Sequence, residues 1–261
     1  MSALMPGPDG STEMLRPHSV AEHADDLSRA FWNGWNAETR ERSLDRVSLE
    51  QMAAAERALD ELGHKDLDII DVGCGAGWMW PVLTSYGSVT GVDLADEVLA
   101  RAAHRWPEAD FVAGDFTKLD LGCDAFDVVV AFEVLSHVAD QWALIEKMHR
   151  SLREDGVLIL ATQNRPALER NAVPAPMPGQ RRRWFDRHEL AELLDPFFEI
   201  DEMRSITPKF NRGPLRIVNS FRLRRAGSQI GLSVLFDRVD RMQEARWLGW
   251  TLVAIGRRKP D

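Results

Sequence analysis

A glycine-rich turn follows an apolar run in the sequence LDIIDVGCGAGWMW, which begins at residue 67. Its glycines permit positive φ angles and let backbone N–H groups approach a ligand at the start of a helix. In an open α/β sheet, such a turn lies in the crevice beyond the strand ends, where ligands bind. The predicted cofactor-binding residues of this segment are Asp71, Gly73, Cys74, Gly75, Gly77 and Trp78.

Trp78 argues against a nicotinamide dinucleotide site. The GxGxxG pattern of those sites needs a small residue at this position, where helix and strand pack closely. The spacing here is GxGxG instead, so residues farther along the chain must identify the ligand.

Two more acidic residues follow the next two apolar runs. Asp93 lies roughly 20 residues after Gly73, a separation suited to accepting hydrogen bonds from ribose hydroxyls. Asp115 can accept from an exocyclic amine, and the ring of Phe116 can cover a purine face. Leu94, and Phe132 at the end of the fourth run, complete the predicted adenosine site.

As a set, these segments resemble the class I S-adenosylmethionine-dependent methyltransferases. DVGCGAG at 71–77 is similar to their first motif, VDL at 92–94 to their ribose acid, GDF at 114–116 to their adenine motif, and FDVVVAFEVLSHV at 126–138 to their fourth strand and its exit. The resemblance covers roughly residues 65–204 and the final strand. It implies a seven-stranded sheet with a reversed last strand, and S-adenosylmethionine as cofactor, but it does not name the methyl acceptor.

His137 is the candidate catalytic residue. Methyl transfer requires alignment of acceptor, methyl carbon and sulfur, and a hydroxyl acceptor also needs a base. His137 lies one helical turn after Glu133; alternatively, it only caps or packs the turn. EVLSHV is similar to the EVLEHV exit of the ubiquinone-pathway O-methyltransferases, some of which bind a divalent ion there. Because Ser136 replaces their second acid, we predict no metal requirement.

The predicted acceptor site or its lid contains Glu133, Gln163, Asn164, Trp32 and Trp35. Asn164 could instead form a turn with Pro166, and the tryptophans of FWNGWN (31–36) could instead pack a cap onto the sheet. The arginines at 181–183 either hold an acidic group of the acceptor or form a solvated loop.

Apolar runs that alternate with helical segments predict a Rossmann-like, doubly wound α/β fold. We expect a core at 65–261 with a helical insertion at 207–246, in which the apolar residues of 214–246 would wall the acceptor site. Residues 1–64 would form a flexible tail and an N-terminal helical cap, in which FWNGWN joins two helices near 20–32 and 45–63. The expected strands are 67–72, 88–94, 110–115, 126–132, 156–163, 197–206 and 249–258.

The amino-acid composition limits the classes of partner and the cellular compartment that we expect for this chain. The formal charge of −9 argues against attraction to nucleic acid. The two cysteines form no metal-binding pattern and suggest a reducing compartment. We found no signal peptide and no apolar run long enough to span a membrane. We therefore expect a cytoplasmic protein without nucleic-acid or membrane partners, compatible with a homodimer.

Together these features predict methyl transfer from S-adenosylmethionine to a hydroxyl of a small molecule. The predominance of arginine over lysine is typical of GC-rich bacterial genomes and weakly favours natural product biosynthesis. The alternatives are an N-methyltransferase on a small molecule, a tRNA or protein methyltransferase, and a cofactor-binding partner protein without activity.

Overall fold

The computed structural model describes residues 4–6, 12–14 and 17–260. The expected tail lies partly outside these residues. Its described parts are two short antiparallel strands, β1 (Leu4–Pro6) and β2 (Thr12–Met14).

A seven-stranded sheet forms the centre of the fold, with strand order β5-β4-β3-β6-β7-β9-β8. All neighbouring pairs up to β7 are parallel, whereas β9 is antiparallel to both β7 and β8. The predicted fold class, including the reversed last strand, is therefore confirmed. The strands are β3 (Leu67–Val72), β4 (Gly87–Asp93), β5 (Asp110–Ala113), β6 (Phe126–Phe132), β7 (Leu152–Gln163), β8 (Phe198–Ile206) and β9 (Thr251–Arg258).

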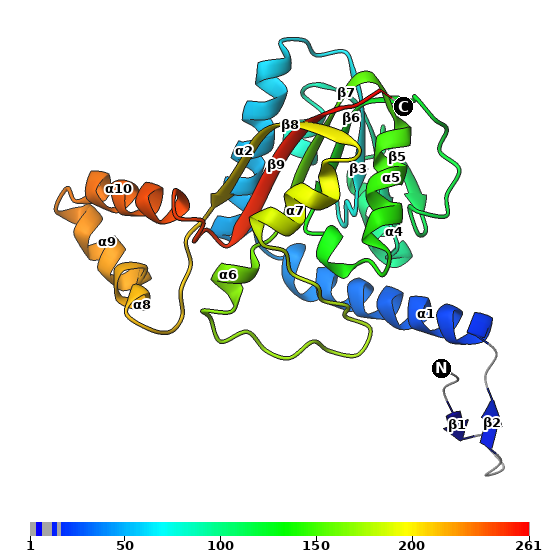
Figure 1. Cartoon of the computed structure of the whole chain (residues 1–261), viewed down its shortest axis with the longest axis horizontal. Coiled ribbons are helices and arrows are strands. Elements are labelled where there is room, and N and C mark those ends of the chain that lie inside the picture. The colour runs from blue at the N-terminus through cyan, green and yellow to red at the C-terminus, as the bar shows by residue number, and fades with distance from the viewer. Residues whose placement is uncertain (1–3, 7–11, 15–16, 261) are drawn as a thin grey trace.

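Helices cover both faces of this sheet (Figure 1). Alternate side chains of each central strand point to opposite faces. In β6, Val128 and Val130 pack with α2 (Arg46–Leu62) and α3 (Trp80–Leu83). Val129 and Ala131 pack with α5 (Gln141–Ser151) and α7 (Arg187–Leu194). Burial on both faces explains why the central strands are continuous apolar runs in the sequence.

Helix α1 (Pro17–Trp35) lies across the edge of the sheet at which the parallel strands end (Figure 1). It continues without a break through FWNGWN and passes into a π-helical turn, η1 (Asn36–Arg40). The prediction that FWNGWN joins two separate helices is therefore wrong. The Asn33 side chain is bonded to α4 (Asp96–Arg105), donating to Asp96 Oδ1 at 3.0 Å and accepting from the Val98 N–H at 3.3 Å. Because that side chain is engaged elsewhere, it does not compete for the backbone bonds of its own helix.

The insertion between β8 and β9 contains α8 (Leu215–Val218), α9 (Phe221–Gln229) and α10 (Ser233–Glu244) and extends to one side of the sheet (Figure 1). The short helices η2 (Leu135–His137) and α6 (Arg165–Leu168) complete the described elements. Within the described part of the chain, no helix is long and apolar enough to cross a membrane.

Candidate active site

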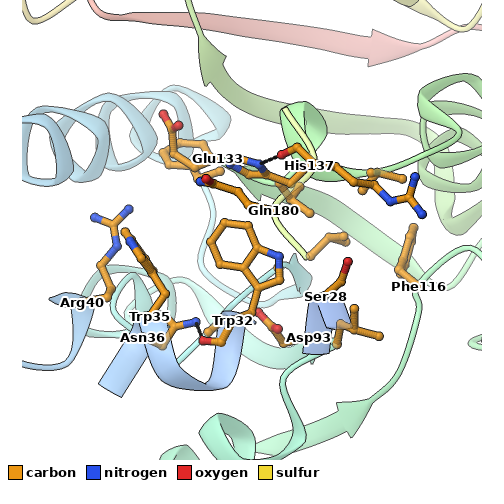
Figure 2. Close-up of a pocket in the computed structure, with 18 of the residues that line it drawn as sticks. Ser28, Trp32, Trp35, Asn36, Arg40, Asp93, Phe116, Glu133, His137 and Gln180 are labelled. Carbon is orange, nitrogen blue, oxygen red and sulfur yellow. Dashed lines mark hydrogen bonds between the residues drawn. The ribbon is translucent and has the colours of Figure 1, made fainter. Parts of the chain in front are cut away.

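A cavity of about 480 Å³ lies between α1 and the carboxyl ends of β3, β4 and β6 (Figure 2). Its wall brings together most of the residues that the sequence predicted for the cofactor and for the acceptor. These are Trp32, Trp35, Gly73, Gly75, Trp78, Asp93, Leu94, Asp115, Phe116, Phe132, Glu133, His137 and Gln163.

Four predicted site residues do not line the cavity but lie behind its wall. Asp71 and Cys74 are buried, and Gly77 packs against the Trp106 ring. Asn164 is also buried: its side-chain amide donates to the carbonyls of Trp247 at 2.9 Å and Gly249 at 2.7 Å. Asn164 therefore joins β7 to the segment before β9. Its own carbonyl accepts from the Ala167 N–H at 3.1 Å, in agreement with its alternative role in a turn with Pro166. The apolar residues of 214–246 also do not wall the site, because none of the described residues in 214–246 lines the cavity; within the predicted insertion at 207–246, Lys209 does.

The glycine turn presents its backbone to the cavity. Gly73 and Gly75 have φ angles of 75° and 53°, in the region that favours glycine. A Cβ atom on Gly73 would lie 2.8 Å from the Val134 Cβ, closer than a side chain could tolerate. The N–H groups of Gly73 and Cys74 both donate to the Val92 carbonyl, at 2.8 and 3.1 Å. The end of β4 thus fixes the shape of the turn.

Asp93 connects the glycine turn to α4. Its two carboxylate oxygens accept from the N–H groups of Gly75 and Ala95, each at 2.8 Å. Burial raises the pKa of Asp93, and backbone hydrogen bonds partly oppose that effect. A carboxylate oxygen can accept more than one hydrogen bond. Asp93 in the cavity wall therefore fits the predicted acceptor of ribose hydroxyls.

Asp115 and Phe116 line the cavity next to Asp93. The Asp115 carboxylate accepts from the Thr117 N–H at 3.0 Å and pairs with Lys118 Nζ at 3.2 Å. The Phe116 ring is nearly fully buried and is labelled in the wall in Figure 2. This arrangement fits the acid and aromatic ring predicted for an adenine.

His137 has a defined tautomer. Its Nδ1 lies 2.6 Å from the Arg181 carbonyl oxygen (Figure 2). A carbonyl can only accept, so Nδ1 carries the proton and Nε2 of the neutral ring keeps a lone pair. Burial lowers the pKa of His137, the Arg181 hydrogen bond raises it, and the Arg182 charge lowers it further, with a net decrease. At neutral pH the ring is able to take up a proton.

Trp32 and Trp35 both face the cavity from α1 (Figure 2). The Trp32 ring contacts the His137 imidazole edge to face, with centroids 4.7 Å apart. The Trp35 ring lies 5.6 Å from the Arg40 guanidinium. The N-terminal helix therefore closes the cavity over the candidate base.

The side chains of EVLSHV have different partners. Glu133 Oε1 accepts from Gln51 Nε2 at 2.5 Å, whereas Ser136 Oγ lies 2.9 Å from Thr162 Oγ1. Among the residues described, no three His, Cys, Asp or Glu side chains gather in a way that could hold a metal ion. Glu133 itself has a φ of 61°, a conformation that costs energy in a residue with a side chain.

Sequence reasoning missed Arg40, Lys209 and Trp250, which also line the cavity. The Arg40 guanidinium lies 4.7 Å from the Trp78 ring centroid, and Lys209 Nζ lies 5.2 Å from that of Trp250. Burial lowers the pKa of Arg40, while the charges of Glu133 and Asp45 raise it, so the net shift is downward. Arg40 belongs to a polar stretch without periodicity, and only the β8–β9 pairing brings Lys209 near Trp250. The sequence carried no signal for either placement.

Comparison with known proteins agrees with this geometry. Residues 70–160 match the methyltransferase domain family. A probable S-adenosylmethionine-dependent methyltransferase of Mycolicibacterium smegmatis is 30% identical over 137 residues, which cover 52% of this chain and 53% of that protein. A ubiquinone biosynthesis O-methyltransferase of Actinobacillus pleuropneumoniae is 34% identical over 107 residues, covering 37% and 46%.

A solved structure matches nearly the whole chain. It is the Burkholderia thailandensis 1,6-didemethyltoxoflavin-N1-methyltransferase with 1,6-didemethyltoxoflavin and S-adenosylhomocysteine bound. The TM-score is 0.59 at 22% identity, over 99% of this chain and 96% of that one. At this identity, the likeness concerns the fold.

These findings confirm the resemblance seen in the sequence: residues 70–160 match the methyltransferase domain family, and curated relatives of the chain are named S-adenosylmethionine-dependent methyltransferases. The named relatives also support S-adenosylmethionine as the cofactor. The chain spans about half the length of the two curated relatives described above.

Proposed function

We propose that this chain is a cytoplasmic enzyme that transfers the methyl group of S-adenosylmethionine to a hydroxyl of a small molecule, such as a secondary metabolite. The observation that carries the proposal is the His137 tautomer. A ring with its proton held at Nδ1 by the Arg181 carbonyl offers Nε2 as a base inside the cavity. Methyl transfer to oxygen needs such a base, because the hydroxyl proton must leave as the O–C bond forms.

The cofactor residues are proposed from their positions. The Gly73–Gly75 turn would hold the amino acid end of S-adenosylmethionine, Asp93 its ribose, and Asp115 with Phe116 its adenine. Bound there, the cofactor supplies an electrophilic methyl group on a sulfonium. As the acceptor oxygen took the methyl group from the sulfonium sulfur, His137 Nε2 would take the hydroxyl proton, and the cofactor would be left as S-adenosylhomocysteine.

Polar groups on the acceptor side support a hydroxylated substrate. Gln163 bonds Glu133 through its side chain, yet within the described residues its Oε1 is buried without a partner. Buried oxygens normally accept a hydrogen bond. We infer that a donor group of the acceptor binds Gln163, while Trp32 and Trp35 exclude water from the reacting atoms.

The test uses S-adenosylmethionine labelled in its methyl group. A cell extract is separated into small-molecule, RNA and protein fractions, and each is incubated with the purified protein. Label is expected in the small-molecule fraction. Label only in RNA or protein would contradict the small-molecule acceptor, and label in no fraction together with tight cofactor binding by calorimetry would favour an inactive partner protein.

His137→Ala then tests the base. We expect it to keep cofactor affinity and lose at least about 100-fold in turnover. His104→Ala, which changes an exposed histidine on α4 outside the cavity, is the matched control and should turn over like the wild type. Wild-type turnover by His137→Ala would eliminate His137 as the base.

A nitrogen acceptor is the second candidate, because the structurally similar Burkholderia enzyme is named an N1-methyltransferase. A neutral amine can attack the methyl group before it loses a proton, so it depends less on a base. The two candidates differ in the pH profile of the turnover rate. For an oxygen acceptor, the rate of the wild type should fall as His137 becomes protonated, and this fall should be absent from His137→Ala; for a nitrogen acceptor, the rate should not depend on His137 protonation.

A further inference from the structure

The helical insertion carries an unusual concentration of exposed apolar side chains. We call residues 212–246, which contain α8, α9 and α10, the arm. Among the described residues, 11 large apolar side chains are exposed, and seven of these belong to the arm. These seven are Ile217, Leu223, Ile230, Leu232, Val234, Leu235 and Met242. Such a concentration usually marks a binding surface.

The arm is also basic. It contains eight arginines and three acidic residues, a net charge of +5, so the rest of the chain, whose total is −9, carries −14. Its exposed arginines are Arg212, Arg216, Arg222, Arg225, Arg238, Arg241 and Arg246. Among the described side chains of the arm, Asp237 is the only exposed acid. The overall negative charge of the chain conceals this local excess.

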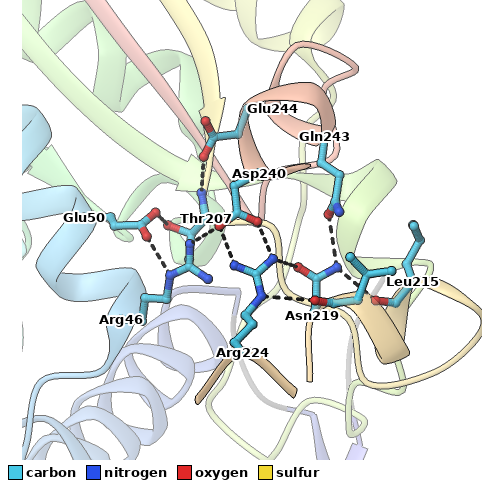
Figure 3. A network of polar contacts seen from close by, with 10 residues as sticks. Arg46, Glu50, Thr207, Leu215, Asn219, Arg224, Asp240, Gln243 and Glu244 are labelled. Carbon is cyan, nitrogen blue, oxygen red and sulfur yellow. Dashed lines mark hydrogen bonds and ion pairs between the residues drawn. The ribbon is translucent and has the colours of Figure 1, made fainter. Parts of the chain in front are cut away.

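A polar network fixes the base of the arm to the core (Figure 3). Asp240 binds both Arg224 within the arm and Arg46 of α2, the latter at 2.7 Å. Glu50 binds Arg46 at 2.7 Å and accepts from Thr207 Oγ1 at 2.5 Å. The buried Asp240 is thus paired with Arg224 and Arg46, while the other seven arginines of the arm remain exposed.

We propose that the arm docks on the surface of an anionic membrane. Its aliphatic side chains would enter the boundary between headgroups and acyl chains, and its arginines would bind lipid phosphates. An arm-to-arm dimer is a less favourable explanation of the exposed surface, because it would bring two sets of exposed arginines together and their like charges would repel. Recognition of single-stranded RNA uses aromatic side chains that stack on bases, whereas none of the seven exposed apolar side chains is aromatic, so a membrane surface fits the arm better.

Docking of this kind needs no spanning helix. The expectation of no membrane partner came from the absence of a long apolar run, which excludes only an inserted segment. Lys209, two residues after Thr207 at the base of the arm, lines the cavity. A docked arm would therefore hold the catalytic domain with one wall of its cavity close to the membrane. The proposal is independent of the methyl acceptor.

The experiment is co-sedimentation of the purified protein with phosphatidylcholine vesicles, with and without roughly one-third phosphatidylglycerol. We expect binding to the anionic vesicles only, and its loss at about 0.5 M salt. Arg222→Glu/Arg225→Glu should weaken binding by at least about tenfold, since each basic residue contributes to the attraction. Arg57→Glu/Arg150→Glu changes the same charge at exposed sites outside the arm and should bind like the wild type.

The apolar contribution is tested with Ile230→Ser/Leu235→Ser, which should also lose about tenfold or more in binding. Leu49→Ser/Met177→Ser, at exposed apolar positions outside the arm, is its control. Far-UV circular dichroism and cofactor affinity confirm that each variant is folded.

Several outcomes would overturn the proposal. These are equal binding to neutral vesicles, no binding to anionic vesicles, and insensitivity to both pairs of arm substitutions. If the protein does not bind vesicles, two results would point to another partner. Arm-dependent binding of bulk tRNA would indicate RNA, and a dimer whose formation the apolar substitutions abolish would indicate a second copy of the chain. Because these measurements use no acceptor, a failed methylation assay leaves them interpretable.

Discussion

Replacement of Asp71 by asparagine should stabilise the protein at alkaline pH. The Asp71 carboxyl is 2% exposed at the end of β3 and accepts a hydrogen bond from Trp80 Nε1 at 3.1 Å. Burial, opposed by that hydrogen bond and aided by the charge of Asp93, raises its pKa from 3.8 to about 7. Asparagine has the same shape, keeps an oxygen for the Trp80 donor and cannot ionise.

The direction in which the free energy of unfolding changes with pH follows from proton uptake by Asp71. Between about pH 4 and about pH 7, the folded chain holds a proton on Asp71 that the unfolded chain has released. The free energy of unfolding therefore falls as pH rises through this window and is lowest above it. A difference of about three pH units, at ~1.4 kcal/mol each, gives an upper limit of roughly 4 kcal/mol. Between pH 5 and pH 8, roughly 2 to 3 kcal/mol of this should appear.

Urea unfolding at a series of pH values measures the effect. The wild type should lose stability relative to Asp71→Asn as pH rises, and the two should converge near pH 4. Asp110→Asn makes the same change at an exposed position, and its free energy of unfolding should change with pH as that of the wild type does. If Asp71→Asn also runs parallel to the wild type, the buried carboxyl does not hold its proton and the reasoning is wrong.

Three further predictions concern the cavity. Asp93→Ala removes the acceptor for two backbone N–H groups and should weaken S-adenosylmethionine binding by at least about tenfold in calorimetry; unchanged affinity would contradict its role. Trp32→Ala opens the cavity above His137 and should lower turnover about tenfold, whereas Trp32→Phe, which keeps an aromatic edge, should stay near the wild type. Dialysis against a chelator should leave turnover unchanged, because Glu133 and Ser136 bind other side chains; recovery of lost activity by Mg²⁺ would refute this.

The fold could be predicted because its central strands leave a simple pattern. A parallel strand that is buried on both faces must be apolar at nearly every position, as Phe126–Phe132 shows. Strand ends were less certain, since they depend on pairing. β7 begins at Leu152, earlier than expected, because Leu152 pairs with Phe126 across an irregularity in the ladder.

The site could be predicted where the chain itself fixes the geometry. The glycine turn, Asp93 and Phe116 follow strands whose ends meet at one edge of the sheet, so their proximity follows from topology. Arg40 and Trp250 reach the cavity through tertiary packing that no local pattern encodes. The prediction that the apolar residues of the insertion wall the acceptor site failed for a related reason. Helical spacing reveals an apolar face but not whether a neighbour covers it.

The acids behind and within the cavity wall connect stability to ligand binding. Burial raises the pKa of both Asp71 and Asp93, so each costs stability when it ionises without a counter-charge. A sulfonium cofactor brings a positive charge to the same edge of the sheet, which favours the ionised forms. The free protein is thus least stable at the alkaline pH at which its carboxylates attract the cofactor most. Burial of these two charges costs stability in the free protein, and binding of a cation at the same edge of the sheet offsets part of that cost.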